Sequence, residues 1–150
     1  FDAPRAILAL EELLIMSMVS RISAVTLLIK DMERSCSFYF NIPGFKLTFG
    51  GDHHDFFTTY EIGQNTSVYL NLELFKLNDY SKYEHSKNLV KIILHVNDVD
   101  KLYHYFKNDQ IISNLISFEN EPTDASWGER YFHIRDPDGY LLSFAQSIKV

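Results

Sequence analysis

The sequence predicts an α+β fold made of two related halves, each consisting of a strand, a helix and further strands. Residues 29–33 (IKDME) are matched 67 residues later by residues 96–100 (VNDVD). Each run follows a short apolar stretch typical of a strand and precedes apolar residues at helical spacing. This repeat is too long for a solenoid unit and too short for two independent domains, so we expect two modules within one fold.

The first module starts with a strand at about residues 22–29, and Asp31 then caps a helix. That helix ends near Pro43 and Gly44, because proline cannot continue it and glycine accepts a left-handed conformation. Residues 45–49, 56–62 and 67–74 have the composition of strands and are separated by glycine-containing turns. Residues 76–88 are polar and rich in tyrosine, and we interpret them as the connection between the modules.

The second module repeats this order with a strand at about residues 89–96 and a helix from residue 99 to about 108, capped by Asp98. Its apolar residues recur at the spacing of a helix that packs on a sheet. Residues 111–118, 131–135 and 141–146 are expected to be the remaining strands. We therefore place the modules at about residues 21–75 and 89–147 of one domain that spans residues 21–147.

Composition excludes several classes of protein. The net charge of -6 and the lack of a basic block argue against nucleic-acid binding. No apolar run approaches the roughly 20 residues that span a bilayer, and the single cysteine, Cys36, fits a reducing compartment, so we expect a cytoplasmic protein with no membrane partner. Residues 1–20 lie outside the repeat; the first 15 are interpreted either as an upstream extension or as a helix that packs on the domain or a partner.

The most specific local signal closes the second module. Residues 136–139 (DPDG) have the chemistry of a tight turn, in which Pro137 fixes one backbone angle and Gly139 permits a positive φ. With the repeat, Phe38-Tyr39, residues 43–45 (PGF) and residues 127–139, the sequence resembles the vicinal oxygen chelate superfamily of glyoxalase, bleomycin-resistance and extradiol-dioxygenase-like domains. The resemblance covers about residues 21–147. It implies two βαβββ modules whose mixed sheet forms an open cup, with the helices outside and the ligand inside.

Strand parity predicts which side chains face this cup, because successive residues of a strand alternate between its two faces. The more apolar set on each strand is expected to face the helices. The remaining side chains of the first, fifth and last strands then point inward: Ala24, Thr26, Leu28, Lys91, Ile93, His95, Leu141, Ser143 and Ala145. The expected cup therefore has apolar walls with two basic groups and some hydroxyls.

The resemblance also implies four ligand positions that hold His, Gln or Glu in metal-dependent glyoxalase-like members. Counted from the two capping aspartates and from the turn, three of these positions fall on Ala24, Lys91 and Ser143. The position on the fourth strand is Glu73 or Asn71, according to its register. Alanine has no donor atom, a lysine ammonium repels a cation and a lone serine is a poor ligand. We predict that the chain holds no metal and needs no cofactor.

Among the six histidines, only His95 and His133 fall on the predicted cup face. With Glu73 they would form a metal or acid–base cluster only if their three strands converge. A histidine that is hydrogen-bonded within the wall is the simpler interpretation. The other four are assigned to a turn or to polar surface: His53, His54, His85 and His104.

Two functions from different classes follow. The first is a metal-independent small-molecule-binding protein of the bleomycin-resistance kind, whose cup holds a hydrophobic or planar ligand. The second is a lyase, isomerase or dioxygenase-like enzyme with a relocated metal site or an acid–base pair such as Lys91 with His95. We favour the first, because three of the four ligand positions are unsuitable, and we expect from the resemblance that the protein is a homodimer. The candidate ligand-binding residues are Lys91, His95, Tyr69, Trp127, Tyr131, His133 and Ser143.

Overall fold

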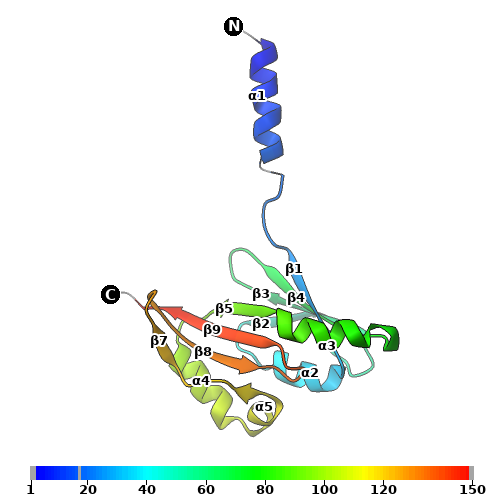
Figure 1. Cartoon of the computed structure of the whole chain (residues 1–150), viewed down its shortest axis with the longest axis vertical. Helices are drawn as coiled ribbons and strands as arrows, with labels where there is room; N and C mark the ends of the chain where they lie inside the picture. The colour runs from blue at the N-terminus through cyan, green and yellow to red at the C-terminus, as the bar shows by residue number, and fades with distance from the viewer. Residues whose placement is uncertain (1–2, 17, 149–150) are drawn as a thin grey trace.

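The computed structural model describes residues 3–16 and 18–148 and confirms the α+β class. The strands form two open mixed sheets, one from each module (Figure 1). The first sheet has the order β1-β4-β3-β2 and consists of β1 (Ala24–Ile29), β4 (Val68–Leu74), β3 (Phe57–Ile62) and β2 (Phe45–Phe49). β1 runs parallel to β4, and the other pairs are antiparallel. The first module therefore has the predicted βαβββ order.

The second sheet repeats this pattern in the order β5-β9-β8-β6. It consists of β5 (Lys91–His95), β9 (Leu141–Ser147), β8 (Glu129–Arg135) and β6 (Ser117–Phe118), while the short β7 (Thr123–Ala125) pairs with β8. β5 is parallel to β9, as β1 is to β4. Because β1 and β5 each end their own sheet, the two sheets do not join within one chain.

Helices α2 (Met32–Tyr39) and α4 (Val99–Asn108) follow β1 and β5 at the predicted positions. The Asp31 carboxylate accepts a hydrogen bond from the Arg34 backbone N–H, and Asp98 does the same for Lys101. The connection between the modules is helical over much of its length, with a short 3-10 turn, η1 (Leu77–Asp79), and helix α3 (Tyr80–Leu89).

The strand predicted at residues 111–118 is wrong over most of its length. Residues Gln110–Leu115 form helix α5, and only Ser117–Phe118 pair with β8. Asp109 caps this helix by accepting a hydrogen bond from the backbone N–H of Ile112. Ile112 and Ile116 are buried at the edge of the core, so tertiary packing outweighs the β propensity of this isoleucine-rich stretch.

Both sheets turn their apolar faces toward one shared core. Leu27 and Ile29 of β1 and Phe144 of β9 belong to the same buried cluster. Helices α2 and α4 contact each other in this core, where the ring centroids of Phe38 and Phe106 are 5.9 Å apart. The opposite, more polar faces of the two sheets therefore point away from the core, and we call them the open faces.

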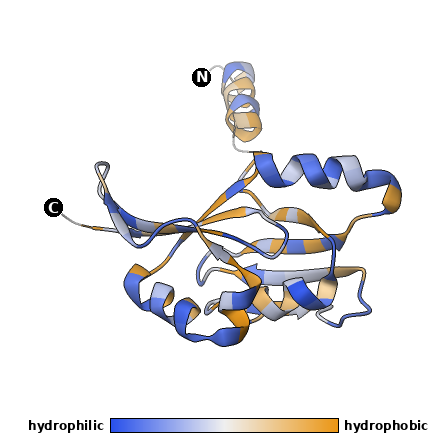
Figure 2. Cartoon of the chain, turned by 60° about the horizontal axis from the view of Figure 1, so that its bottom comes forward, coloured by the Kyte–Doolittle hydropathy of each residue, from blue (hydrophilic) through white to orange (hydrophobic). Residues whose placement is uncertain are grey.

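Helix α1 (Ala3–Met16) stands apart from the two sheets (Figures 1 and 2). The colours of Figure 2 show both apolar and polar residues along it, and none of its residues is buried. Within the part of the chain that the structure describes, no helix is both long and apolar enough to cross a membrane.

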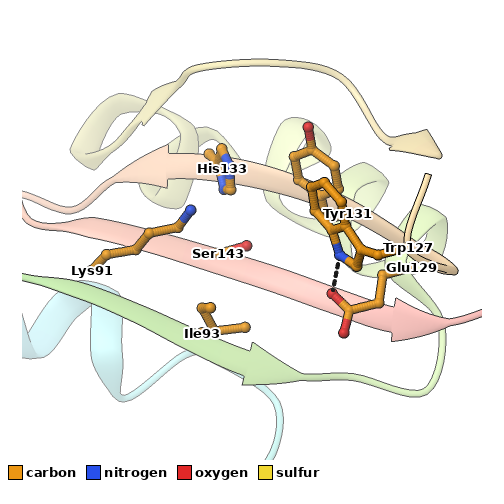
Figure 3. A pocket seen from close by; sticks show the side chains of 7 residues that line it. All are labelled: Lys91, Ile93, Trp127, Glu129, Tyr131, His133 and Ser143. Carbon is orange, nitrogen blue, oxygen red and sulfur yellow. Dashed lines mark hydrogen bonds between the residues drawn. The ribbon is translucent and has the colours of Figure 1, made fainter. Parts of the chain in front are cut away.

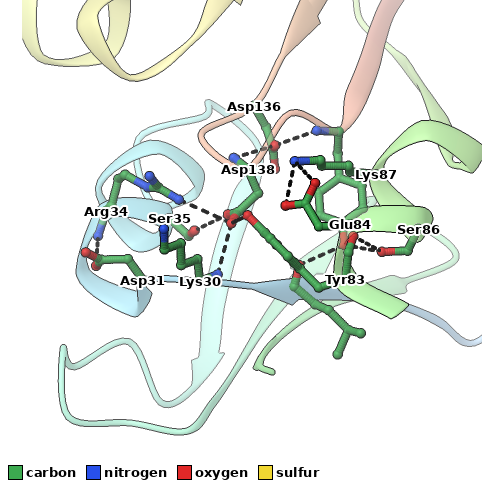
Figure 4. A network of polar contacts seen from close by, with 12 residues as sticks. Lys30, Asp31, Arg34, Ser35, Tyr83, Glu84, Ser86, Lys87, Asp136 and Asp138 are labelled. Atoms are coloured by element: carbon green, nitrogen blue, oxygen red, sulfur yellow. Dashed lines mark hydrogen bonds and ion pairs between the residues drawn. The ribbon is translucent and has the colours of Figure 1, made fainter. Parts of the chain in front are cut away.

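The DPDG turn between β8 and β9 connects the second module to the first through hydrogen bonds (Figure 4). The Asp138 side chain is fully buried and accepts hydrogen bonds from the Lys30 backbone N–H, the Ser35 hydroxyl and the Tyr83 hydroxyl at 2.9, 3.0 and 2.8 Å. Arg34 pairs with the same carboxylate at 3.2 Å. These donors come from the β1–α2 loop, α2 and α3. The Asp138 side chain therefore links these three segments to the turn.

Candidate ligand-binding site

The open face of the second sheet carries a hollow of about 340 Å³ (Figure 3). This volume is near the lower end of the range for small-molecule sites. All of the lining comes from the second module: Lys91, Ile93, Trp127, Glu129, Tyr131, His133 and Ser143.

Strand pairing explains why these side chains share one face. Ile93 lies opposite Ser143, which lies opposite His133, so the three form a row across β5, β9 and β8. Lys91 comes two residues before Ile93 and Tyr131 two residues before His133, which places both on the same side of the sheet. The parity predicted for these strands is confirmed: Ile92 and Leu94 are more buried than their neighbours on β5, and Leu142 and Phe144 lie in the core.

One end of the hollow is aromatic. The rings of Trp127 and Tyr131 are stacked, with centroids 6.1 Å apart and an interplanar angle of 18°. The indole Nε1 donates a hydrogen bond to Glu129 at 3.1 Å, which orients the ring (Figure 3). Because 70% of Trp127 remains exposed, its surface is available to a planar molecule.

The other end is polar and basic. Lys91 and Ser143 point into the hollow beside His133 (Figure 3). Burial lowers the pKa of His133 below its ordinary value, and the charges of Lys91 and Arg135 lower it further, against an opposing effect of Glu119. The imidazole is therefore neutral at neutral pH. Its Nδ1 is shielded from solvent and has no hydrogen-bond partner among the residues that the structure describes.

Two of the predicted binding residues lie outside this hollow. Tyr69 is on β4, in the other sheet, where it is paired with Ala24. His95 shares the open face of β5 but sits beyond the hollow, opposite Ala145. Conversely, Glu129 was missed, because the strand was predicted to begin at Tyr131; the alternation of β8 extended by two residues would have placed it on this face.

The strand register shows that Asn71, and not Glu73, is the residue of β4 equivalent to Ser143. Asn71 pairs with Thr26, just as Ser143 pairs with Ile93, and Thr26 and Ile93 are equivalent in the repeat. The four family positions are therefore Ala24, Asn71, Lys91 and Ser143. This set contains neither a carboxylate nor an imidazole, so these residues do not fit a transition-metal ion.

Residues 3–16 and 18–148 contain one other candidate group of ligands. Among the residues that the structure describes, the one group of three His, Cys, Asp or Glu side chains whose ligand atoms converge is Asp52, His53 and His54. It is exposed on the turn between β2 and β3 and belongs to the first module. The strands that carry Glu73, His95 and His133 do not bring these three side chains together, so the alternative of a cluster there is not met within the chain.

Comparison with known proteins gives a consistent assignment. The profile of the Glyoxalase/Bleomycin resistance protein/Dioxygenase superfamily matches residues 21–144. A search of curated proteins finds no match. Among solved structures, a member of this superfamily from Sphaerobacter thermophilus is 24% identical, with a TM-score of 0.59 over 87% of this chain and 99% of that one. A hypothetical protein from S. aureus is 23% identical, with a TM-score of 0.65 over 89% and 98% of the two chains.

An antibiotic-binding protein from Streptomyces is 18% identical, with a TM-score of 0.60 over 87% of this chain and 98% of that one. At these identities the structural matches establish the fold alone, whereas the profile match covers most of the sequence. The chain belongs to the glyoxalase/bleomycin resistance protein/dioxygenase superfamily.

Proposed function

We propose that this protein binds a hydrophobic or planar small molecule without a metal ion. The observation that carries the proposal is the composition of the hollow on the second sheet. Stacked Trp127 and Tyr131 supply a flat apolar surface, while Lys91 occupies a position where metal-dependent relatives would hold a ligand. Small-molecule sites commonly combine such apolar walls with a few polar groups.

The electrostatics of the hollow support metal independence. A divalent cation placed beside the Lys91 ammonium would be repelled, and this repulsion would weaken every binding event. His133 and Glu129 give the hollow one imidazole and one carboxylate, whereas stable transition-metal sites use three or four protein ligands. Elemental analysis of protein purified without a histidine tag is expected to show no stoichiometric Zn, Ni, Mn or Fe. About one tightly held ion per chain would contradict this part of the proposal.

We further propose that the protein acts as a homodimer. The open faces of the two sheets lie on opposite sides of the shared core, so one chain presents two half-cups and no closed one. Strands β1 and β5 end their sheets, and edge strands carry unpaired backbone groups that favour pairing with another chain. A second copy that places its β1 against β5 would set its own open face, including the hydrogen-bonded row Thr26, Asn71 and Thr59, across from the hollow.

The cellular setting completes the proposal. We place the protein in the cytoplasm, with a small molecule as its partner and no role for nucleic acid or membrane. The acidic net charge of -6 and the single buried Cys36 support this placement.

Binding in the presence of EDTA tests the function directly. The neutral fluorescent dye N-phenylnaphthylamine is a planar apolar probe that can be titrated against the untagged protein. We expect saturable binding that is about fivefold weaker in Trp127→Ala, because the variant loses the stacking surface. Phe40→Ala is the matched control, since it removes an exposed aromatic ring at the end of α2, outside the hollow. No saturable binding, or equal losses in both variants, would refute the proposal.

A further inference from the structure

We propose that the natural ligand is an aromatic acid with a single anionic group. The anionic group lies at the Lys91 end of the hollow, and the ring lies on Tyr131 and Trp127. This inference rests on the proposed function, because it names the class of molecule that the same site takes.

Lys91 is the cation of the hollow. Lys91 points into the hollow and makes no hydrogen bond or ion pair with any residue that the structure describes. The two arginines of β8 are different. Arg130 pairs with Asp100 and Asp124, each at 2.8 Å, and Arg135 pairs with Glu119 at 2.8 Å. The hollow thus contains a positive charge that no carboxylate among the described residues contacts directly, whereas the two arginines of β8 are already paired.

Polar and apolar side chains both surround the Lys91 ammonium group. Ser143 and His133 lie beside Lys91 and offer a hydroxyl and a neutral imidazole, so an anion bound there has polar groups around it as well as one ammonium. The wall on the β5 side is Ile93, which is apolar and 63% exposed. A carboxylate or sulfonate bound there would accept a charge-assisted hydrogen bond from Lys91, which is stronger than a hydrogen bond between neutral groups.

The two ends of the hollow carry opposite charges, which determines the orientation of the ligand. Glu129 lies at the aromatic end, where it accepts the hydrogen bond from Trp127. Its negative charge opposes a second anionic group at that end, while Lys91 attracts one at the other. A molecule with one acidic group and one flat ring therefore fits in a single orientation, and a di-acid with charges at both ends does not.

Two related dyes separate this inference from the general binding function. Anilinonaphthalene sulfonate has the same ring system as N-phenylnaphthylamine and adds one sulfonate group. We expect the native protein to bind the sulfonate more tightly than the neutral dye. Lys91→Met should weaken sulfonate binding about fivefold to tenfold more than it weakens binding of the neutral dye, because it removes the charge and keeps most of the stem.

Two further variants serve as controls. Lys91→Arg keeps the charge and should keep the preference for the sulfonate. Lys101→Met removes an exposed lysine of α4 and should change neither affinity. If both dyes bind equally well and Lys91→Met affects neither, the aromatic-acid inference is wrong while the binding function stands. If neither dye binds, the binding function itself has failed. If Lys101→Met matches Lys91→Met, the preference is a general effect of surface charge and the inference is also wrong.

Discussion

Replacing Asp138 by alanine tests the claim that the DPDG turn joins the two modules. The Asp138 carboxylate is fully buried and has four donors: the Lys30 N–H, the Arg34 guanidinium, and the hydroxyls of Ser35 and Tyr83 (Figure 4). Each buried donor left without an acceptor costs about 1–3 kcal/mol. Local rearrangement and entry of water recover part of this sum, so we expect a loss of about 3–5 kcal/mol in the free energy of unfolding.

Urea denaturation at neutral pH measures this loss, and a thermal melt should show a fall of roughly 10 °C or more in Tm. Asp98→Ala is the matched control, because Asp98 makes one exposed capping bond, to the Lys101 N–H at 3.0 Å. Its removal should cost only about 1 kcal/mol. If Asp138→Ala costs no more than Asp98→Ala, the turn does not hold the modules together in the way described.

Three other predictions follow from the same structure. Gly139 has a φ of +97°, so Gly139→Val should destabilise the fold by about 1–3 kcal/mol through backbone strain; an unchanged Tm would show that this conformation is wrong. Burial raises the pKa of Asp136 from 3.8 to about 6, although the hydrogen bond from the Tyr39 hydroxyl opposes the shift. The folded state then binds the extra proton between those values, and its stability falls as the pH rises from about 4 to 6, by on the order of 3 kcal/mol. Asp136→Asn should flatten this part of the profile in urea denaturation across that pH range, and parallel profiles for the two proteins would contradict the shift. Light scattering should give the mass of two chains, and a single-chain mass throughout the micromolar range would refute the homodimer.

Local patterns in the sequence were sufficient to predict most of the elements and which side chains of β1 and β5 face the core. The caps at Asp31 and Asp98 and the alternation in β5 depend on neighbouring residues alone, and the structure has both where they were predicted. The segment 110–115 was mistaken for a strand, because isoleucines are frequent in strands and the burial that makes it helical comes from residues far away in the chain.

The composition of the hollow was predicted only in part, since it depends on how the sheets are arranged. Parity placed Lys91, Ser143 and His133 on the open face, but it could not show that Tyr69 belongs to a separate sheet. How the two sheets are placed depends on contacts between the modules, such as that of Phe38 with Phe106, which the alternation within a single strand cannot predict.

The central claim is that this chain binds a planar small molecule without a metal ion. Its most direct test is a titration of the EDTA-treated, untagged protein with N-phenylnaphthylamine, repeated after Zn, Ni, Mn or Fe is added. We predict the same Kd in every titration, because Ala24, Asn71, Lys91 and Ser143 offer no metal site. Binding that appears only after one of these ions is added would contradict the claim.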